Sequence, residues 1–204
     1  MTRLRDWDSF ALLLIDVQRD FRDDDQVRHF PDFSTNIQRL LQFCRNEGIE
    51  IVHIRALFAP DRSDWMAKYR VKGSIPCVRG TEGAETLPFA LAAPGEIEME
   101  KQAFDAFHIP GLVSHLHQAG KRFLLTAGLL TSVCVFLTTA SAAQRGFLTA
   151  MVTDCCADEP EAHESTIKRY PFIFDCTTVD QLTIDYERWQ ENLEKLSSGF
   201  KGGL

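Results

Sequence analysis

The feature that most constrains how this chain folds is an alternation between short apolar runs and helix-forming segments. Apolar runs of this kind are typical of parallel strands that are buried on both faces of a sheet. We expect strands at residues 10–17, 49–54, 96–99, 123–127, 147–152 and, as an edge strand, 172–178. We expect helices at residues 34–47, 110–119, 131–145, 160–169 and 179–195. This order predicts an α/β fold, a three-layer α-β-α sandwich with a central, mostly parallel sheet.

Length and composition agree with a single domain that spans residues 1–204. With 204 residues, 45% of them hydrophobic and 25% charged, the chain can bury a sizeable core and has the composition of a globular protein. The segment 57–98 breaks the alternation because it is rich in proline and glycine. We expect it to be a long excursion with one short helix near residues 62–69, which serves as a lid over a site or as a subunit contact.

Charge and cysteine content argue against several classes of function. The 22 basic and 29 acidic residues give a net charge of −7, so the chain has no overall attraction for nucleic acid. The apolar run near the start of the chain is far shorter than the roughly 20 residues of a transmembrane helix and lacks the form of a signal peptide. The six cysteines include no Cys-x-x-Cys pair and are expected to be reduced thiols. We therefore expect a cytoplasmic protein that does not bind membranes.

Two charged side chains follow predicted strands, at the edge where parallel sheets bind ligands. Asp16 ends the first apolar run, where a buried carboxylate is costly unless it is paired. The alternative is a solvated carboxylate at a strand end. Lys101 follows the strand at 96–99, and beside Glu98 and Glu100 it could equally be an ordinary surface lysine. It gains a role only if an anionic group of the site lies next to it.

Cys134 is a third candidate at the same edge. It falls in the first turn of the helix predicted at 131–145, after a strand that runs into Gly128. Unpaired N–H groups and the positive end of the helix dipole stabilise a thiolate there, and the same N–H groups can hold an oxyanion. The alternative is a small buried hydrophobic side chain, which is what most free cysteines are. Cys155 and Cys156 also follow a strand and are weaker candidates for reactivity.

Together, three stretches of sequence resemble those of one family. They are Leu-Leu-Ile-Asp-Val-Gln-Arg-Asp-Phe at 13–21, Glu-Lys-Gln-Ala-Phe-Asp-Ala-Phe at 100–107 and Gly-Leu-Leu-Thr-Ser-Val-Cys-Val at 128–135. In this order they resemble the isochorismatase-like cysteine hydrolases, which include nicotinamidases and N-carbamoylsarcosine amidohydrolases. The resemblance extends over about residues 8–185 and implies the Rossmann-like topology of that family.

The resemblance implies a catalytic triad of Asp16, Lys101 and Cys134. Cys134 would be the nucleophile, Asp16 would accept its proton and later protonate the leaving amine, and Lys101 would pair with Asp16. The family also has a cis peptide bond before the nucleophile, which here falls at Leu129–Leu130. The backbone N–H groups of Leu130 and Cys134 would form the oxyanion hole. The implied reaction is hydrolysis of an amide or ureido C–N bond through a thioester, which needs no cofactor.

One departure from the family concerns a metal ion. Nicotinamidases of this family bind a metal through an Asp-x-His pattern and further histidines after the second strand. Here residues 52–61 contain only one histidine, His53, and no Asp-x-His pattern. We therefore expect no metal site and disfavour nicotinamide as the substrate. We interpret His53 as a structural residue of its strand.

The substrate pocket is less constrained by the sequence than the triad is. The candidate pocket residues are Gln18, Phe21, Arg55, Trp65, Arg79, Phe104 and Phe107. Arg79 could bind a substrate carboxylate through two hydrogen bonds, or it could anchor a loop or a dimer contact. The family implies a small amide or ureido substrate and a homo-oligomer, a dimer or tetramer. Its contacts are expected in the excursion at 57–98 or on the helix that carries Trp189.

Two other functions are compatible with the sequence. The chain could hydrolyse a vinyl ether as isochorismatases do, with Asp16 as the acid and Cys134 as a bystander. It could also be a non-enzymatic thiol sensor on the same fold, in which Cys134 is oxidised without turnover. Activity that survives Cys134→Ala but not Asp16→Asn would favour the vinyl ether hydrolase, whereas loss in both variants would favour the amidohydrolase.

Overall fold

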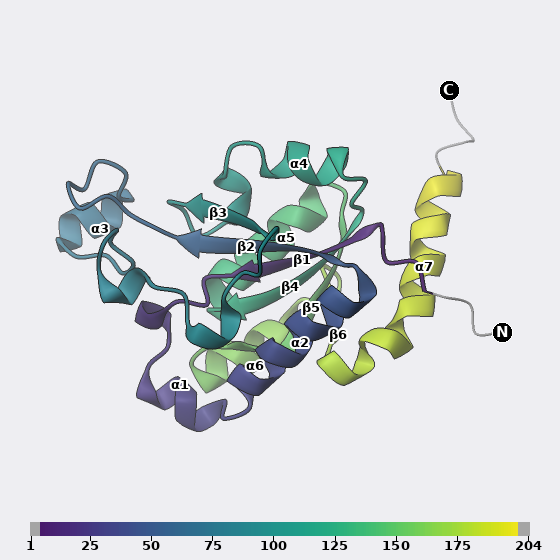
Figure 1. Cartoon of the computed structure of the whole chain (residues 1–204), viewed down its shortest axis with the longest axis horizontal. Helices are drawn as coiled ribbons and strands as arrows, with labels where there is room; N and C mark the ends of the chain where they lie inside the picture. The colour runs from purple at the N-terminus through teal and green to yellow at the C-terminus, as the bar shows by residue number, and fades with distance from the viewer. Residues whose placement is uncertain (1–4, 200–204) are drawn as a thin grey trace.

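A computed structural model describes residues 5–199 and has a six-stranded, wholly parallel sheet at its centre (Figure 1). The strands are β1 (Phe10–Ile15), β2 (Glu50–Ala56), β3 (Ile97–Lys101), β4 (Phe123–Leu129), β5 (Leu148–Ala157) and β6 (Asp175–Thr177). They lie in the order β3-β2-β1-β4-β5-β6. The first three strands thus run from β1 at the centre to β3 at one edge, and the last three run from β4 at the centre to β6 at the other edge. This is the α/β sandwich that the sequence predicts.

Helices cover both faces of this sheet (Figure 1). They are α1 (Asp24–His29), α2 (Phe33–Glu47), α3 (Ala67–Lys72), α4 (Leu112–Gln118), α5 (Phe136–Gln144), α6 (Pro160–Arg169) and α7 (Leu182–Gly199). One hydrophobic core lies beneath α2 and α7 and a second lies beneath α4 and α5. Within residues 5–199, no helix combines the length and the apolar character that crossing a bilayer requires.

The burial of β1 on both faces explains why its sequence is a continuous apolar run. Phe10, Leu12 and Leu14 belong to the core beneath α2 and α7, and the residues between them belong to the opposite core. Burying one large apolar side chain contributes about 1.5–3 kcal/mol to folding. Trp189 of α7 packs against Phe10 and Phe123 and is fully buried, so the Trp189 side chain is unavailable to a subunit contact.

Several elements of the second half differ from their predicted bounds, and the edge strand predicted at 172–178 shrinks to β6 at Asp175–Thr177. β5 runs to Ala157 instead of ending at residue 152, because it pairs with β4 again after a register shift, Cys156 with Gly128 and Ala157 with Leu129. The Asp154 carboxylate within β5 accepts hydrogen bonds from the Val179 N–H at 3.1 and 3.3 Å. The helix predicted at 131–145 begins as a π-helical turn at Thr131–Val135, and regular α5 follows it.

The excursion between β2 and β3 contains a helix that is displaced from its predicted place. We expected it near residues 62–69, and α3 occupies 67–72. The residues before it form a closed turn instead: the Asp64 carboxylate accepts from the Ala59 N–H at 2.8 Å, and the Trp65 indole N–H donates to the Ala59 carbonyl at 2.7 Å. Side chain–backbone hydrogen bonds of this kind compete with helix formation.

The first part of the excursion, around α3, lies beyond the carboxyl ends of β1 and β2, and its later part returns along α2 to the start of β3 (Figure 1). It has a small hydrophobic core of its own, which includes Phe58, Trp65 and Cys77. It is tied to the main domain where the Asp20 carboxylate accepts from the Cys77 N–H at 2.7 Å. The sheet edge at which parallel α/β proteins bind ligands is therefore covered by this segment.

We predict that Gly128→Ala strongly destabilises the fold. Gly128 has a φ of +125°, and a Cβ placed there would lie 1.9 Å from the Ile15 carbonyl oxygen of neighbouring β1. The overlap requires the two central strands to separate, so we expect a loss of about 3 kcal/mol or more in urea unfolding. Gly48→Ala is the matched control, because Gly48 also has positive φ (+71°) but has nothing within 4 Å of the new Cβ. It should lose only about 1 kcal/mol, and equal losses in both variants would contradict the steric explanation.

Candidate active site

Asp16 lies directly after β1, and its carboxylate is completely buried. Its backbone has a φ of +52°, a left-handed conformation that aspartate tolerates better than most residues do. Its N–H donates to the Ile54 carbonyl of β2 at 2.8 Å, which holds the residue at the edge of the sheet. Unusual backbone conformations of this kind are concentrated at functional sites.

Lys101 is the last residue of β3, and its side chain is almost fully buried. Its Nζ atom lies 2.7 Å from Asp16 Oδ2 and donates to the Ala103 carbonyl at 2.9 Å. The same Nζ atom lies 3.5 Å from Cys134 Sγ. Because β1 and β3 flank β2 and end at the same edge, the carboxylate and the ammonium meet there. A buried carboxylate is retained only with such a partner.

Cys134 occupies the π-helical turn Thr131–Val135, which follows β4. The peptide bond between Leu129 and Leu130 that leads into the turn is cis, at the position that the family resemblance implies. The Cys134 side chain is buried, with its sulfur directed at Lys101. The three side chains of the expected triad thus come together from β1, β3 and the segment after β4.

Side chains from the end of β5 and from α6 hold the turn that carries Cys134. The Asp158 carboxylate accepts from the Ser132 N–H at 2.7 Å and from the Ser132 hydroxyl at 2.6 Å. The Thr131 hydroxyl lies 2.8 Å from His163 Nδ1. Sequence reasoning missed Asp158, because the strand was predicted to end at residue 152, whereas Asp158 directly follows the end of β5 at Ala157.

The electrostatics of the site favour a neutral Cys134 thiol in the resting protein. Burial raises the pKa of the thiol above its usual range, the Asp16 carboxylate raises it further, and the Lys101 ammonium opposes both. Burial also raises the pKa of Asp16, against the attraction of Lys101. The sequence led us to expect a thiolate stabilised by the start of a helix. In this setting burial and the Asp16 carboxylate both act against the thiolate, so the thiol needs a base to lose its proton.

Cys134 and Lys101 open onto a small cavity of about 20 Å³ between the sheet edge and the excursion. Its aromatic lining comes from separate segments of the chain and consists of Phe21, Phe58, Tyr69 and Phe104. Phe21 and Phe104 are therefore the two predicted pocket residues that line the cavity. This volume is far below the roughly 300–1,000 Å³ of pockets for drug-sized ligands, which favours a small substrate.

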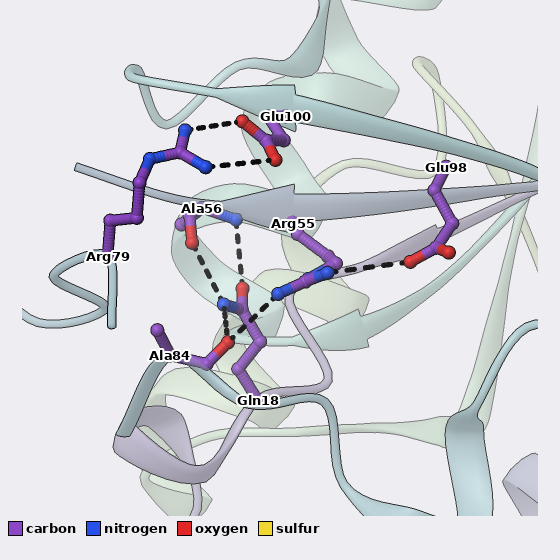
Figure 2. Close-up of polar contacts among 7 residues, drawn as sticks. All are labelled: Gln18, Arg55, Ala56, Arg79, Ala84, Glu98 and Glu100. Atoms are coloured by element: carbon purple, nitrogen blue, oxygen red, sulfur yellow. Dashed lines mark hydrogen bonds and ion pairs between the residues drawn. The ribbon is translucent and has the colours of Figure 1, made fainter. Parts of the chain in front are cut away.

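The buried side chain of Gln18 binds backbone groups of two segments (Figure 2). It does not line this cavity. Its amide oxygen accepts from the Ala56 N–H at 2.8 Å, and its amide nitrogen donates to the carbonyls of Ala56 and Ala84 at 2.8 and 2.9 Å. All three of these hydrogen bonds are buried inside the protein. Gln18 therefore joins the end of β2 to the excursion and fixes the cavity wall indirectly.

The other predicted pocket residues also lie outside the cavity lining. Arg55 is directed at Glu98, and Arg79 pairs with Glu100 at the surface (Figure 2). Trp65 is buried in the small core of the excursion, and Phe107 is buried in the core beneath α4 and α5. Large apolar side chains in these segments serve packing, and the arginines are held by the acidic residues of β3.

The side chains present do not fit a metal ion. Among residues 5–199, no three His, Cys, Asp or Glu side chains group closely enough to hold one. His53 Nε2 lies 2.8 Å from Glu96 Oε2, and that carboxylate also binds Arg45. His53 therefore connects β2 to the segment before β3 as a structural residue, and no step of the chemistry is assigned to a metal.

The chain is similar to proteins of one family along most of its length. Residues 10–181 match the family model of the isochorismatase domain. A probable inactive nicotinamidase of Arabidopsis thaliana is 26% identical over 197 residues, which cover 92% of this chain and 97% of that protein. Nicotinamidase 3 of the same plant is 26% identical over 183 residues, with 85% and 87% covered. The solved structure of an isochorismatase family protein from Desulfovibrio vulgaris has a TM-score of 0.78 at 28% identity, covering 86% of this chain and 96% of that one. The chain therefore belongs to the isochorismatase family of hydrolases.

Proposed function

We propose that this protein is a cysteine amidohydrolase that cleaves the C–N bond of a small amide or ureido compound through a thioester on Cys134. The observation that carries the proposal is the position of Lys101 Nζ, 2.7 Å from Asp16 Oδ2 and 3.5 Å from Cys134 Sγ. A nucleophile, a base and a cation thus share one buried site beside a cavity. The nicotinamidase relatives support an amide as the scissile group. One of them is named as probably inactive, so the proposal rests on the residues of this chain.

The first half of the reaction forms the thioester. As the Cys134 sulfur attacks the carbonyl carbon, the S–H proton passes to the Asp16 carboxylate and a C–S bond forms. Asp16 then gives that proton to the nitrogen of the leaving group, the C–N bond breaks, and ammonia or an amine departs. Lys101 keeps the cluster electrically balanced during both transfers. The raised pKa of Asp16 suits this role, because a base must also be able to act as an acid.

The second half releases the product. A water molecule gives its proton to Asp16 as its oxygen attacks the thioester carbon, and the C–S bond breaks. The proton returns from Asp16 to sulfur, which restores the thiol and leaves a carboxylic acid. In both halves we assign the oxyanion to the backbone N–H groups of Leu130 and Cys134, following the family resemblance.

We expect Cys134→Ala and Asp16→Asn each to lose about 1,000-fold or more of kcat, because each removes a group that forms or breaks bonds. Ammonia release from a panel of amides and ureido compounds measures this. Cys176→Ala is the control, because Cys176 is an exposed thiol on β6, outside the cavity lining. Full turnover in Cys134→Ala with loss in Asp16→Asn would contradict the proposal and favour vinyl ether hydrolysis. Oxidation of Cys134 without turnover of any amide would favour a thiol sensor.

The pH dependence of kcat/KM should report the Asp16 carboxylate. Asp16 acts as a base only when it is ionised, and burial raises its pKa. Activity should therefore be present above the raised pKa of Asp16 and should be lost as the pH falls through that pKa. The loss should occur at a pH above about 3.9, the ordinary pKa of aspartate. Circular dichroism at each pH separates this loss from unfolding. An acid limb at or below pH ~4 in the folded protein would contradict the role of Asp16.

Charge balance in the cluster can be tested separately from catalysis. Lys101→Met leaves the Asp16 carboxylate buried without a partner, so we expect it to lose about 3–5 kcal/mol in urea unfolding. The double variant Asp16→Asn/Lys101→Met should recover much of that loss, since it removes both charges. Additive losses in this cycle would show that the two groups do not interact.

A further inference from the structure

We propose that the substrate of this site is an uncharged amide with a compact hydrocarbon substituent, aromatic or branched aliphatic, and that the site rejects amides that carry a carboxylate. This inference rests on the proposed function, because it names the substrate class for hydrolysis at Cys134. It follows from the chemistry of the cavity wall, from the commitments of Lys101, and from the positions of two arginines.

The wall that faces Cys134 is made of hydrocarbon. Besides Lys101 and Cys134, the lining includes Phe21, Met66 and Ile75 together with the other aromatic residues described above. The Tyr69 hydroxyl is the single other polar side-chain group among the lining residues, all of which belong to the described part of the chain. A bound substrate would therefore place its substituent against carbon atoms on every side, which favours an apolar group.

The Lys101 ammonium is already paired and is therefore not available to bind a substrate carboxylate. Its ammonium is paired with the Asp16 carboxylate at 2.7 Å, donates to the Ala103 carbonyl at 2.9 Å, and faces the Cys134 sulfur at 3.5 Å. A second anion in the cavity would compete with Asp16 for the one cation of the site. That competition would remove the charge balance on which the buried base depends.

The two arginines near this edge contact glutamates of β3 (Figure 2), and neither of them lines the cavity. The Arg55 guanidinium lies 3.5 Å from Glu98 and donates to the Ala84 carbonyl at 3.4 Å. Arg79 binds both oxygens of Glu100, at 2.7 and 3.5 Å. Glu98 and Glu100 are on β3, immediately before Lys101, so the same strand supplies the catalytic cation and neutralises these two cations.

A carboxylate placed in this cavity would therefore lose its hydration without gaining a partner. Burying an unpaired charge costs several kcal/mol in proteins. Because each tenfold change in kcat/KM corresponds to about 1.4 kcal/mol, we expect the site to prefer an uncharged amide over its carboxylate counterpart by about 100-fold or more.

The experiment compares amides that differ in one group. The pairs are 4-methylbenzamide with 4-carboxybenzamide, and cis-but-2-enamide with maleamate. In each pair a methyl group replaces a carboxylate at the same position. Ammonia release by the wild-type protein gives kcat/KM, and we expect the uncharged member to be favoured by about 100-fold or more in at least one pair. Equal or higher kcat/KM for the carboxylates would overturn the inference and leave the amidohydrolase proposal intact.

Binding to Cys134→Ala separates the two proposals. This variant is expected not to turn over, so calorimetric titration with the same pairs reports the cavity alone. Tighter binding of the uncharged members without any wild-type turnover would support the inference about the cavity and overturn the proposed function. Equal binding of the two members, or binding of neither, would overturn the inference.

Charge variants test the cause of the preference. Met66→Arg places a cation in the lining, and we expect it to shift the ratio of kcat/KM toward the carboxylates by about 10-fold or more. Arg79→Met removes a cation that lies outside the lining, and the ratio should stay as in the wild type. If Arg79→Met selectively abolishes turnover of the carboxylates, Arg79 reaches the substrate and the inference is wrong.

Discussion

The buried ion pair between Asp16 and Lys101 is the interaction on which the rest of the site depends. Neither charge is tolerable alone in this interior, and together they occupy the edge of the sheet where β1 and β3 end. The pair also lies against the Cys134 sulfur, so the contact that makes two buried charges tolerable also places a carboxylate and an ammonium beside a thiol. The order β3-β2-β1-β4 brings these three distant parts of the sequence to one point.

Burial gives this site a chemistry different from that of an exposed, low-pKa cysteine. Desolvation raises the pKa of the thiol, so in the proposed reaction the sulfur attacks only as Asp16 accepts its proton. Desolvation also raises the pKa of Asp16, which suits the proposed role of this carboxyl group as base and then as acid. The hydrocarbon wall supplied by the excursion maintains this dry environment, and it also limits which substituents can enter. In this proposal, burial by the hydrocarbon wall determines both the reactivity of Cys134 and Asp16 and the selectivity for uncharged substituents.

Much of this arrangement could be predicted because it depends on local pattern. The apolar run of β1, the spacing of α2 and α6, and the convergence of parallel strands at one edge all follow from short stretches of sequence. The roles of Gln18, Arg55 and Arg79 could not be predicted in this way. Their side chains are directed by partners far along the chain, such as Ala84 and Glu100, and a residue type alone does not show which partner it has. The π-helical turn was missed because Asp158 fixes it from the end of another strand.

The central claim is that hydrolysis passes through an acyl group on Cys134, and partitioning with hydroxylamine tests it most directly. An acyl-enzyme has lost its leaving group before water or hydroxylamine attacks. The amide and the methyl ester of the same acid should therefore give the same ratio of hydroxamate to acid at a given hydroxylamine concentration. Ratios that differ between the two substrates, or turnover without any hydroxamate, would contradict a thioester on Cys134.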